Sequence, residues 1–232
     1  MSTPASTSTT GAVSSAATAR SYDQWCPIAV GLDVLGDRWT LLVLRELTLG
    51  DRRFSDLRRE LPGIAPNLLT ERLRTLVDLR LVESVDLPPP AARSVYRITD
   101  DGRAASPVLR ALARFGVRYL TGAPTEQFDA KRAASSLLVP WWRPGLDPVV
   151  VRLVLLSTDG PPSAADVHVD ADTCSVVRVD EPDAPHPHVD VTLRTSAPEL
   201  VAVRNDGVTF ATAPAGPAAK VRAALRAFAL DR

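Results

Sequence analysis

Apolar residues recur at helical spacing in the first part of the chain. Between Ile28 and Leu49 they lie three or four residues apart, which predicts an amphipathic helix that is bent or broken near Gly36. A short second helix is expected around Phe54-Ser55-Asp56-Leu57, with Ser55 capping its N-terminus. A third helix is expected to begin near Pro66, because proline suits a first helical turn. Its inward face carries Leu69, Leu73, Leu76 and Val77.

After Leu79 and Arg80 the apolar period changes from helical to alternating. Val82–Val85 and Ser94–Ile98 predict two strands, joined by an exposed, proline-rich tip at Pro88–Arg93. Three helices followed by a hairpin predict a winged helix-turn-helix, in which the third helix can enter a DNA major groove and the hairpin can touch the flanking backbone. A last helix through Val108–Tyr119 carries an apolar stripe suited to packing or dimerisation.

The second half of the chain has a different pattern. A helical stretch to Leu138 is followed by β-rich segments, which loops rich in Pro, Asp and Gly separate, and then by two helical segments. The expected strands are Val149–Ser157, Asp166–Asp170, Ser175–Val179 and Val189–Thr195, and the expected helices are Pro198–Val203 and Pro217–Leu230. We therefore predict an α+β fold with three parts: a disordered tail over 1–20, a winged helix-turn-helix domain over 21–122, and a C-terminal α+β domain over 123–232, with a mainly β sheet covered by helices.

Composition and charge indicate how the protein could contact DNA and in which compartment it is expected. The 232 residues have no net charge, but residues 1–122 contain 16 arginines against 13 acidic residues and residues 123–232 have the opposite imbalance. That surplus is modest for a DNA-binding domain, so a phosphate-facing surface must come from local clustering. Cys26 and Cys174 lie far apart in the sequence and match neither a C-x-x-C metal motif nor a disulfide framework. This cysteine usage favours a reducing cytoplasm. The Ser- and Thr-rich start does not read as a signal peptide, and no apolar run is long enough to span a membrane.

Several linked motifs resemble the HxlR-type branch of the MarR-like winged-helix regulators over about Trp25–Tyr119. They are Cys26-Pro27-Ile28, Leu35-Gly36-Asp37-Arg38-Trp39, Arg53-Phe54-Ser55-Asp56-Leu57, Leu69-Thr70-Glu71-Arg72-Leu73 and Tyr96-Arg97-Ile98-Thr99-Asp100-Asp101-Gly102. The resemblance implies a homodimer that represses or activates genes by binding a near-palindromic, double-stranded DNA operator. Arg80 departs from the pattern, because such proteins usually have Gly there. We expect a steric cost at this position and a different helix exit.

The candidate DNA-binding residues lie on the second and third helices and the wing. They are Arg52, Arg53, Ser55, Pro66, Asn67, Thr70, Arg72, Arg74 and Arg93. Asn67, Thr70 and Arg74 lie opposite the apolar face and are expected to meet base edges. The arginines at 52, 53, 58 and 59 are expected to contact phosphates, which position a protein without specifying sequence. An ordinary solvated face is the alternative, and Arg72 can equally be a structural ion-pair partner.

The second half more weakly resembles the sterol carrier protein-like fold, a small α+β module that encloses an apolar ligand. The likeness rests on a strand that ends at Thr195, a helix start at Pro198, a turn at Gly207, and Gly216 before an apolar helix. It implies a small hydrophobic effector. Trp141 and Trp142 can line its pocket or simply pack in the core or at a domain interface.

The remaining candidate chemistry is sparse. Cys26 can sense oxidants, as in some HxlR-type proteins, or be a small buried residue. His168, His186 and His188 have no firm third ligand, so we expect no metal and no cofactor. Enzyme motifs are missing, and we do not expect an enzyme. The sequence thus predicts an effector-controlled DNA-binding regulator. Two alternatives stay open: a lipid- or metabolite-binding protein that uses the winged helix for dimerisation, or a second half that only mediates protein contacts.

Overall fold

The computed structural model describes residues 21–88, 93–121, 128–157, 160–184 and 186–230. Contacts divide the chain into a first unit, Met1–Ala105, and a second unit, Ser106–Arg232. This division falls ahead of the domain boundary expected at residue 122, because the helix that begins at Ser106 packs with the second unit. The predicted tail over 1–20 and the centre of the proline-rich tip, residues 89–92, lie outside the described residues.

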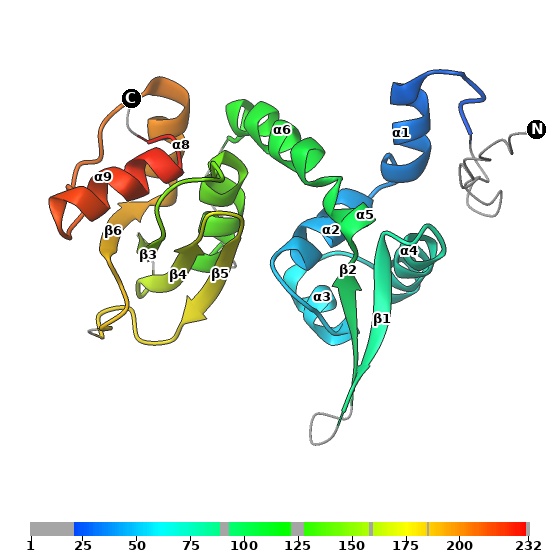
Figure 1. The fold of residues 1–232 in the computed structure, drawn as a ribbon, viewed down its shortest axis with the longest axis horizontal. Helices are drawn as coiled ribbons and strands as arrows, with labels where there is room; N and C mark the ends of the chain where they lie inside the picture. Colours follow the sequence, from blue (N-terminus) through cyan, green and yellow to red (C-terminus); the bar gives the residue numbers. More distant parts are fainter. Residues whose placement is uncertain (1–20, 89–92, 122–127, 158–159, 185, 231–232) are drawn as a thin grey trace, which may run out of the picture. The chain divides into compact units, whose positions relative to one another are not determined.

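The first unit has the predicted order of three-helix core and hairpin (Figure 1). Its elements are α1 (Pro27–Leu35), α2 (Thr40–Thr48), α3 (Phe54–Glu60), α4 (Pro66–Asp78), β1 (Val82–Leu87), β2 (Arg93–Ile98) and α5 (Asp100–Arg103). The expected break near Gly36 is confirmed, because α1 and α2 are separate helices. The core of the unit is aliphatic, and α4 buries Leu69, Leu73 and Leu76 in it as its spacing predicts.

The N-cap assigned to Ser55 was wrong. The α3 helix begins at Phe54, so its N-cap is Arg53, two residues before Ser55, and Ser55 is an exposed residue of the first turn. The Asp56 carboxylate accepts a hydrogen bond from the Arg53 backbone N–H at 3.2 Å. A carboxylate in the first turn also interacts favourably with the helix dipole, so Asp56 stabilises the start that Ser55 was expected to cap.

The helix exit at Arg80 also differs from expectation. Arg80 adopts the left-handed conformation, with φ of 59°, that glycine would take at this position. The Leu81 N–H donates to the Leu76 carbonyl, and the Thr99 hydroxyl donates to the Arg80 carbonyl at 2.7 Å. These contacts hold the turn in place, so the chain keeps the usual exit and accepts the steric cost of a side chain there.

The wing is an antiparallel hairpin in which Val82 pairs with Ile98 and Leu87 with Arg93. The backbone of Arg52 adds a bridge to Tyr96, with hydrogen bonds in both directions. This bridge fixes the base of the wing to the segment that precedes α3.

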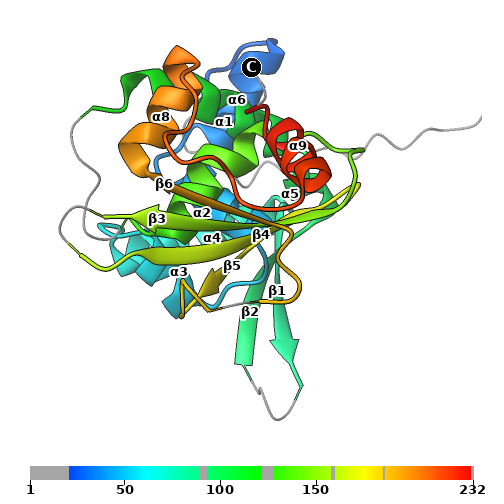
Figure 2. The same ribbon diagram turned by 90° about the vertical axis from the view of Figure 1, so that its left-hand side faces the viewer.

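The second unit is a four-stranded sheet with helices on one face (Figure 2). It contains α6 (Ser106–Gly116), η1 (Val117–Tyr119), α7 (Ala130–Ala133), η2 (Ala134–Leu138), η3 (Val139–Trp141), β3 (Val149–Leu156), β4 (Ser163–Val169), β5 (Cys174–Val179), β6 (Val191–Ser196), α8 (Ala197–Asp206) and α9 (Ala218–Ala227). The strand order is β5-β4-β3-β6, and only the β3–β6 pair is parallel. All four strands and both later helices occur where the sequence predicts them.

Three hydrogen bonds that involve Glu199 fix the junction between β6 and α8. Ser196 caps α8 by accepting from the Glu199 N–H, and the Glu199 carboxylate accepts from the Thr195 hydroxyl at 2.7 Å and from the Ala211 N–H at 2.6 Å. Although burial raises the pKa of Glu199, these hydrogen bonds outweigh it and lower that pKa below its ordinary value of 4.5. The Gly207 that ends α8 is left-handed, with φ of 66°.

Candidate nucleic-acid interface

The outer face of α4 presents the polar side chains that were predicted to read bases. Asn67, Thr70, Glu71 and Arg74 are all exposed, on the side of the helix opposite its buried leucines. The Thr70 hydroxyl donates to the Pro66 carbonyl at 3.0 Å, which leaves its oxygen free to accept. Arg74 is paired only loosely, with Asp78 at 4.0 Å, and its side chain is 82% exposed. An exposed pair of this kind is weak, so Arg74 can turn to another acceptor.

Arg72 lies elsewhere on the same helix. Its side chain is only 12% exposed, and its Nη1 contacts the Asp37 carboxylate at 2.8 Å. Its Nε donates to the Arg38 carbonyl at 3.2 Å. The structure therefore supports the alternative that Arg72 is a structural ion-pair partner, and it does not bring Arg72 together with Asn67, Thr70 and Arg74.

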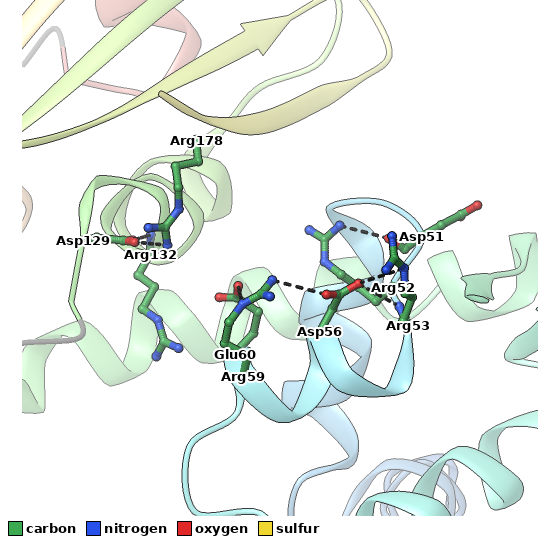
Figure 3. A network of polar contacts seen from close by, with 9 residues as sticks. All are labelled: Asp51, Arg52, Arg53, Asp56, Arg59, Glu60, Asp129, Arg132 and Arg178. Atoms are coloured by element: carbon green, nitrogen blue, oxygen red, sulfur yellow. Dashed lines mark hydrogen bonds and ion pairs between the residues drawn. The ribbon is translucent and has the colours of Figure 1, made fainter. Parts of the chain in front are cut away.

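The arginines at the start of α3 form a cluster with acidic residues (Figure 3). Asp56 lies between Arg53 and Arg59, with its oxygens 3.9 and 3.4 Å from the two guanidinium groups. Both arginines are exposed. The half-buried Arg52 donates to the Asp51 carbonyl at 3.1 Å, and Arg58 is exposed. Such exposed pairs contribute about 0 to 1 kcal/mol each, so phosphates can compete for these arginines.

The wing has little spare positive charge within the described residues. Arg97 binds the Asp51 carboxylate at 2.6 Å and lies 3.7 Å from Glu83. Its hydrogen bonds to Asp51 raise the pKa of the Arg97 guanidinium, and the charge of Asp51 acts in the same direction. Arg93, the predicted tip contact, is the first residue of β2. Because Asp51 and Glu83 neutralise Arg97 at the base of the hairpin, the wing is a weaker candidate for phosphate contact than α3.

The predicted sensor and ligand residues belong to elements other than α3, α4 and the wing. Cys26 is the N-cap residue of α1 and is a half-buried, free thiol. In the second unit Trp141 is buried beneath the Arg204 guanidinium, which lies 4.5 Å from its ring centroid. The half-buried Trp142 has an indole Nε1 with no hydrogen-bond partner in the part of the chain that the structure describes. The described residues contain no group of three potential metal ligands.

Sequence reasoning missed two features of this region. Asp37 and Trp39 were noted as parts of a motif, but nothing in their spacing indicated that Asp37 contacts Arg72 of α4 or that Trp39 lies near Gly63. The apolar residues of the first helix predicted an amphipathic helix but not that Ile28, Val30 and Leu32 are exposed. None of the helices in the described ranges has the length and apolar character needed to cross a bilayer.

A three-helix core, an exposed polar face on its third helix and a following hairpin define a winged helix-turn-helix protein. The sequence profile of the HxlR-like helix-turn-helix family matches residues 34–123. A helix-turn-helix-type transcriptional regulator of Synechocystis is 39% identical over 95 residues, which cover 41% of this chain and 70% of that protein. The regulator YvaP of Bacillus subtilis is 30% identical over 98 residues, which cover 42% of this chain and 91% of that protein. The chain belongs to the HxlR-like helix-turn-helix family.

Other relatives match over less of their length. An uncharacterized helix-turn-helix-type transcriptional regulator of Mycobacterium tuberculosis is 43% identical over 89 residues, 38% of this chain, and the match spans about half of that protein, 56%. The solved structure of reduced YodB from B. subtilis has 28% identity and a TM-score of 0.37, and it covers 41% of this chain and 95% of that one. The Synechocystis, B. subtilis YvaP and M. tuberculosis relatives are all named as helix-turn-helix-type transcriptional regulators.

Proposed function

We propose that the protein is a dimeric, DNA-binding transcription regulator that reads its operator with the outer face of α4. One observation carries this proposal: Asn67, Thr70 and Arg74 are exposed together on a helix whose other face is anchored by three buried leucines. Asn can pair with adenine and Arg with guanine in the major groove. The exposed arginines of α3, the helix that precedes α4, supply phosphate contacts.

Substitution of Arg74 tests the reading role. Against a duplex selected from a random library by the wild-type protein, Arg74→Ala is expected to weaken binding by about 5- to 150-fold, as loss of a base contact worth 1–3 kcal/mol would. Binding to a scrambled duplex should change much less. Arg222→Ala, which removes an exposed arginine from α9, is the matched control and should change neither affinity. Unchanged discrimination in Arg74→Ala would refute its assignment as a reader.

The dimer rests on exposed apolar helix faces. Along α6 and η1, Val108, Leu112, Phe115 and Tyr119 follow one stripe and are 45 to 67% exposed. The stripe has the three- and four-residue spacing of a helix that packs on another helix, and a second copy of the chain would bury it. Sedimentation velocity should show a dimer at micromolar concentration. Phe115→Glu should shift it to monomer, whereas Arg118→Glu at an exposed polar position beside it should not. A monomeric wild-type protein would contradict the dimer.

The second unit is the proposed effector domain. Its support is the set of features that underlie the sterol carrier-like resemblance: the capped helix after β6, the left-handed Gly207, and Gly216, where a Cβ atom would lie 2.4 Å from the Asp190 carbonyl oxygen. Trp142 adds a buried donor without a partner among the described residues, which a carbonyl or carboxylate oxygen of an effector would satisfy.

A fluorescent fatty acid tests the effector proposal. It should bind with a stoichiometry of about one per chain, and Trp142→Phe should weaken binding because the indole donor is lost. To act as an effector, it must also change operator affinity, since a ligand shifts an equilibrium only through unequal affinity for the two states. Binding without a change in operator affinity would favour the alternative of a lipid- or metabolite-binding protein, and no binding would contradict the proposal for this class of ligand.

A further inference from the structure

The turn between α1 and α2 is strained and tightly built. Trp39, the N-cap residue of α2, has φ of 78° in the left-handed region, which is costly for a bulky residue. Gly36 ends α1 where a Cβ atom would lie 2.5 Å from the Leu32 carbonyl oxygen. A conformation of this kind persists only when contacts elsewhere hold it.

Those contacts come from the segment that carries the recognition helix. Arg72 of α4 binds both the Asp37 carboxylate, at 2.8 Å, and the Arg38 carbonyl, at 3.2 Å. The Trp39 ring reaches the connection between α3 and α4, because a Cβ atom on Gly63 would lie 3.8 Å from Trp39 Cη2. The turn is therefore held from α4 by Arg72 and contacts the α3–α4 connection through Trp39.

Helix geometry separates Arg72 from the reading face. Successive residues are rotated by about 100°, so Arg72 lies about 140° around α4 from Asn67, whereas Thr70 and Arg74 lie within about 60° of Asn67. The Arg72 side chain is also largely buried, and its Nη1 lies 2.8 Å from the Asp37 carboxylate and 3.4 Å from that of the neighbouring Glu71. Its guanidinium is thus placed to fix the helix and not to meet base edges.

We propose that Asp37 and Arg72 are a positioning pair that sets the orientation of α4 against the α1–α2 turn. The role rests on the proposed reading of DNA by α4. Because Asp37 directly follows Gly36 at the end of α1, the pair also connects the exposed apolar helix α1 to the recognition helix.

The pair must affect discrimination between DNA sequences rather than general affinity. A tilted α4 loses base contacts but leaves phosphate contacts from α3 in place. Arg72→Ala is therefore expected to weaken binding to the selected duplex about tenfold, comparable to one mismatched base pair, with unchanged affinity for the scrambled duplex. Arg72→Lys should behave similarly, since an ammonium group cannot reproduce the two-pronged contact with Asp37 and Arg38.

Asp37 supplies the second arm of the test. Asp37→Asn removes the charge but leaves the Arg38 carbonyl contact, so a smaller loss of about threefold is expected. The double variant Asp37→Asn/Arg72→Ala should bind the selected duplex no more weakly than Arg72→Ala alone, because the two residues act through one contact. Asp37 is half exposed, so this variant remains informative if Arg72→Ala does not fold, which urea unfolding would reveal.

Fluorescence anisotropy on both duplexes over a salt series separates the outcomes. Selective loss and non-additivity support the positioning pair. A loss on both duplexes with a salt slope reduced by about one would make Arg72 a phosphate ligand and overturn the proposal, as would additive effects of the two substitutions or unchanged discrimination. A wild-type protein that selects no sequence refutes the proposed function itself, before any variant is compared.

Discussion

Asp166→Asn removes the counter-charge of a guanidinium that lies inside the second unit. Arg152 on β3 and Asp166 on β4 are directly paired across the antiparallel ladder, and their side chains are 5% and 8% exposed. Two hydrogen bonds of 2.8 and 3.0 Å join them, and Arg152 also donates to the Ala184 carbonyl at 2.7 Å. The hydrogen bonds to Asp166 raise the pKa of Arg152. Because arginine is not deprotonated in proteins, the guanidinium stays charged even when Asp166 is replaced by a neutral residue.

Asp166→Asn is expected to lower the unfolding free energy strongly, because solvent cannot screen the charge that remains on the buried Arg152. Removing one partner of a buried ion pair costs about 3–5 kcal/mol of unfolding free energy. Asp183→Asn is the matched control: Asp183 contacts Arg194 at 2.7 Å, but the two side chains are 71% and 40% exposed. That pair is screened by water, so its loss should cost at most about 1 kcal/mol.

Urea unfolding followed by tryptophan fluorescence measures the difference. Trp141 and Trp142 lie in the second unit, so replacing Trp25 and Trp39 by Phe gives a signal from that unit alone. This matters because a chain of two compact units need not unfold in one transition. If Asp166→Asn destabilises the second unit no more than Asp183→Asn does, the reasoning from burial is wrong.

Three further predictions concern single side chains. Folding lowers the pKa of Glu199, so its ionised carboxylate stabilises the fold above its ordinary pKa of 4.5, and this stabilisation is lost as the pH falls through the lower folded value. Unfolding curves measured from pH 6 to 2 should show this loss in the wild type and a smaller loss in Glu199→Gln. Burial raises the pKa of the Cys174 thiol to about 12, so a thiol reagent at pH 8 should label Cys26 much faster, and equal rates in Cys26→Ser and Cys174→Ser would contradict this. Gly102→Ala should destabilise the first unit by about 1–3 kcal/mol or more in thermal unfolding, because the new Cβ would lie 2.0 Å from the Leu81 carbonyl oxygen; a variant as stable as the wild type would show that the backbone moves easily.

Local patterns predicted the elements well for a physical reason. Alternating burial along β6 reflects a strand with one face in the core, whereas β3 is an apolar run that is buried over most of its length. The spacing of leucines in α4 reflects one buried helix face. The mistaken cap at Ser55 came from judging residue type alone, since the Asp56 carboxylate reaches back to Arg53 and starts the helix earlier. Residue type indicates which side chains can cap a helix, but the position of the cap depends on which of the competing side chains binds the free N–H groups of the first turn.

The candidate site was predictable only in part. The outward face of α4 follows from helical periodicity, so Asn67, Thr70 and Arg74 could be selected from the sequence. The partner of Arg72 could not, because Asp37 lies on a different helix connection and only the packing of α4 brings the two together. Similarly, Arg80 takes a left-handed conformation that its residue type disfavours, since the Thr99 hydroxyl and the backbone around it hold the turn.

Binding of the wild-type protein to the intergenic DNA upstream of its own gene tests the central claim most directly. Fluorescence anisotropy should be measured on this duplex and on a scrambled one, from low to physiological salt. A regulator that reads bases through α4 is predicted to bind the upstream duplex tightly and selectively, with a preference that survives physiological salt while general affinity falls. Equal, salt-labile binding to both duplexes would contradict operator reading at this site and would favour the ligand-binding alternative.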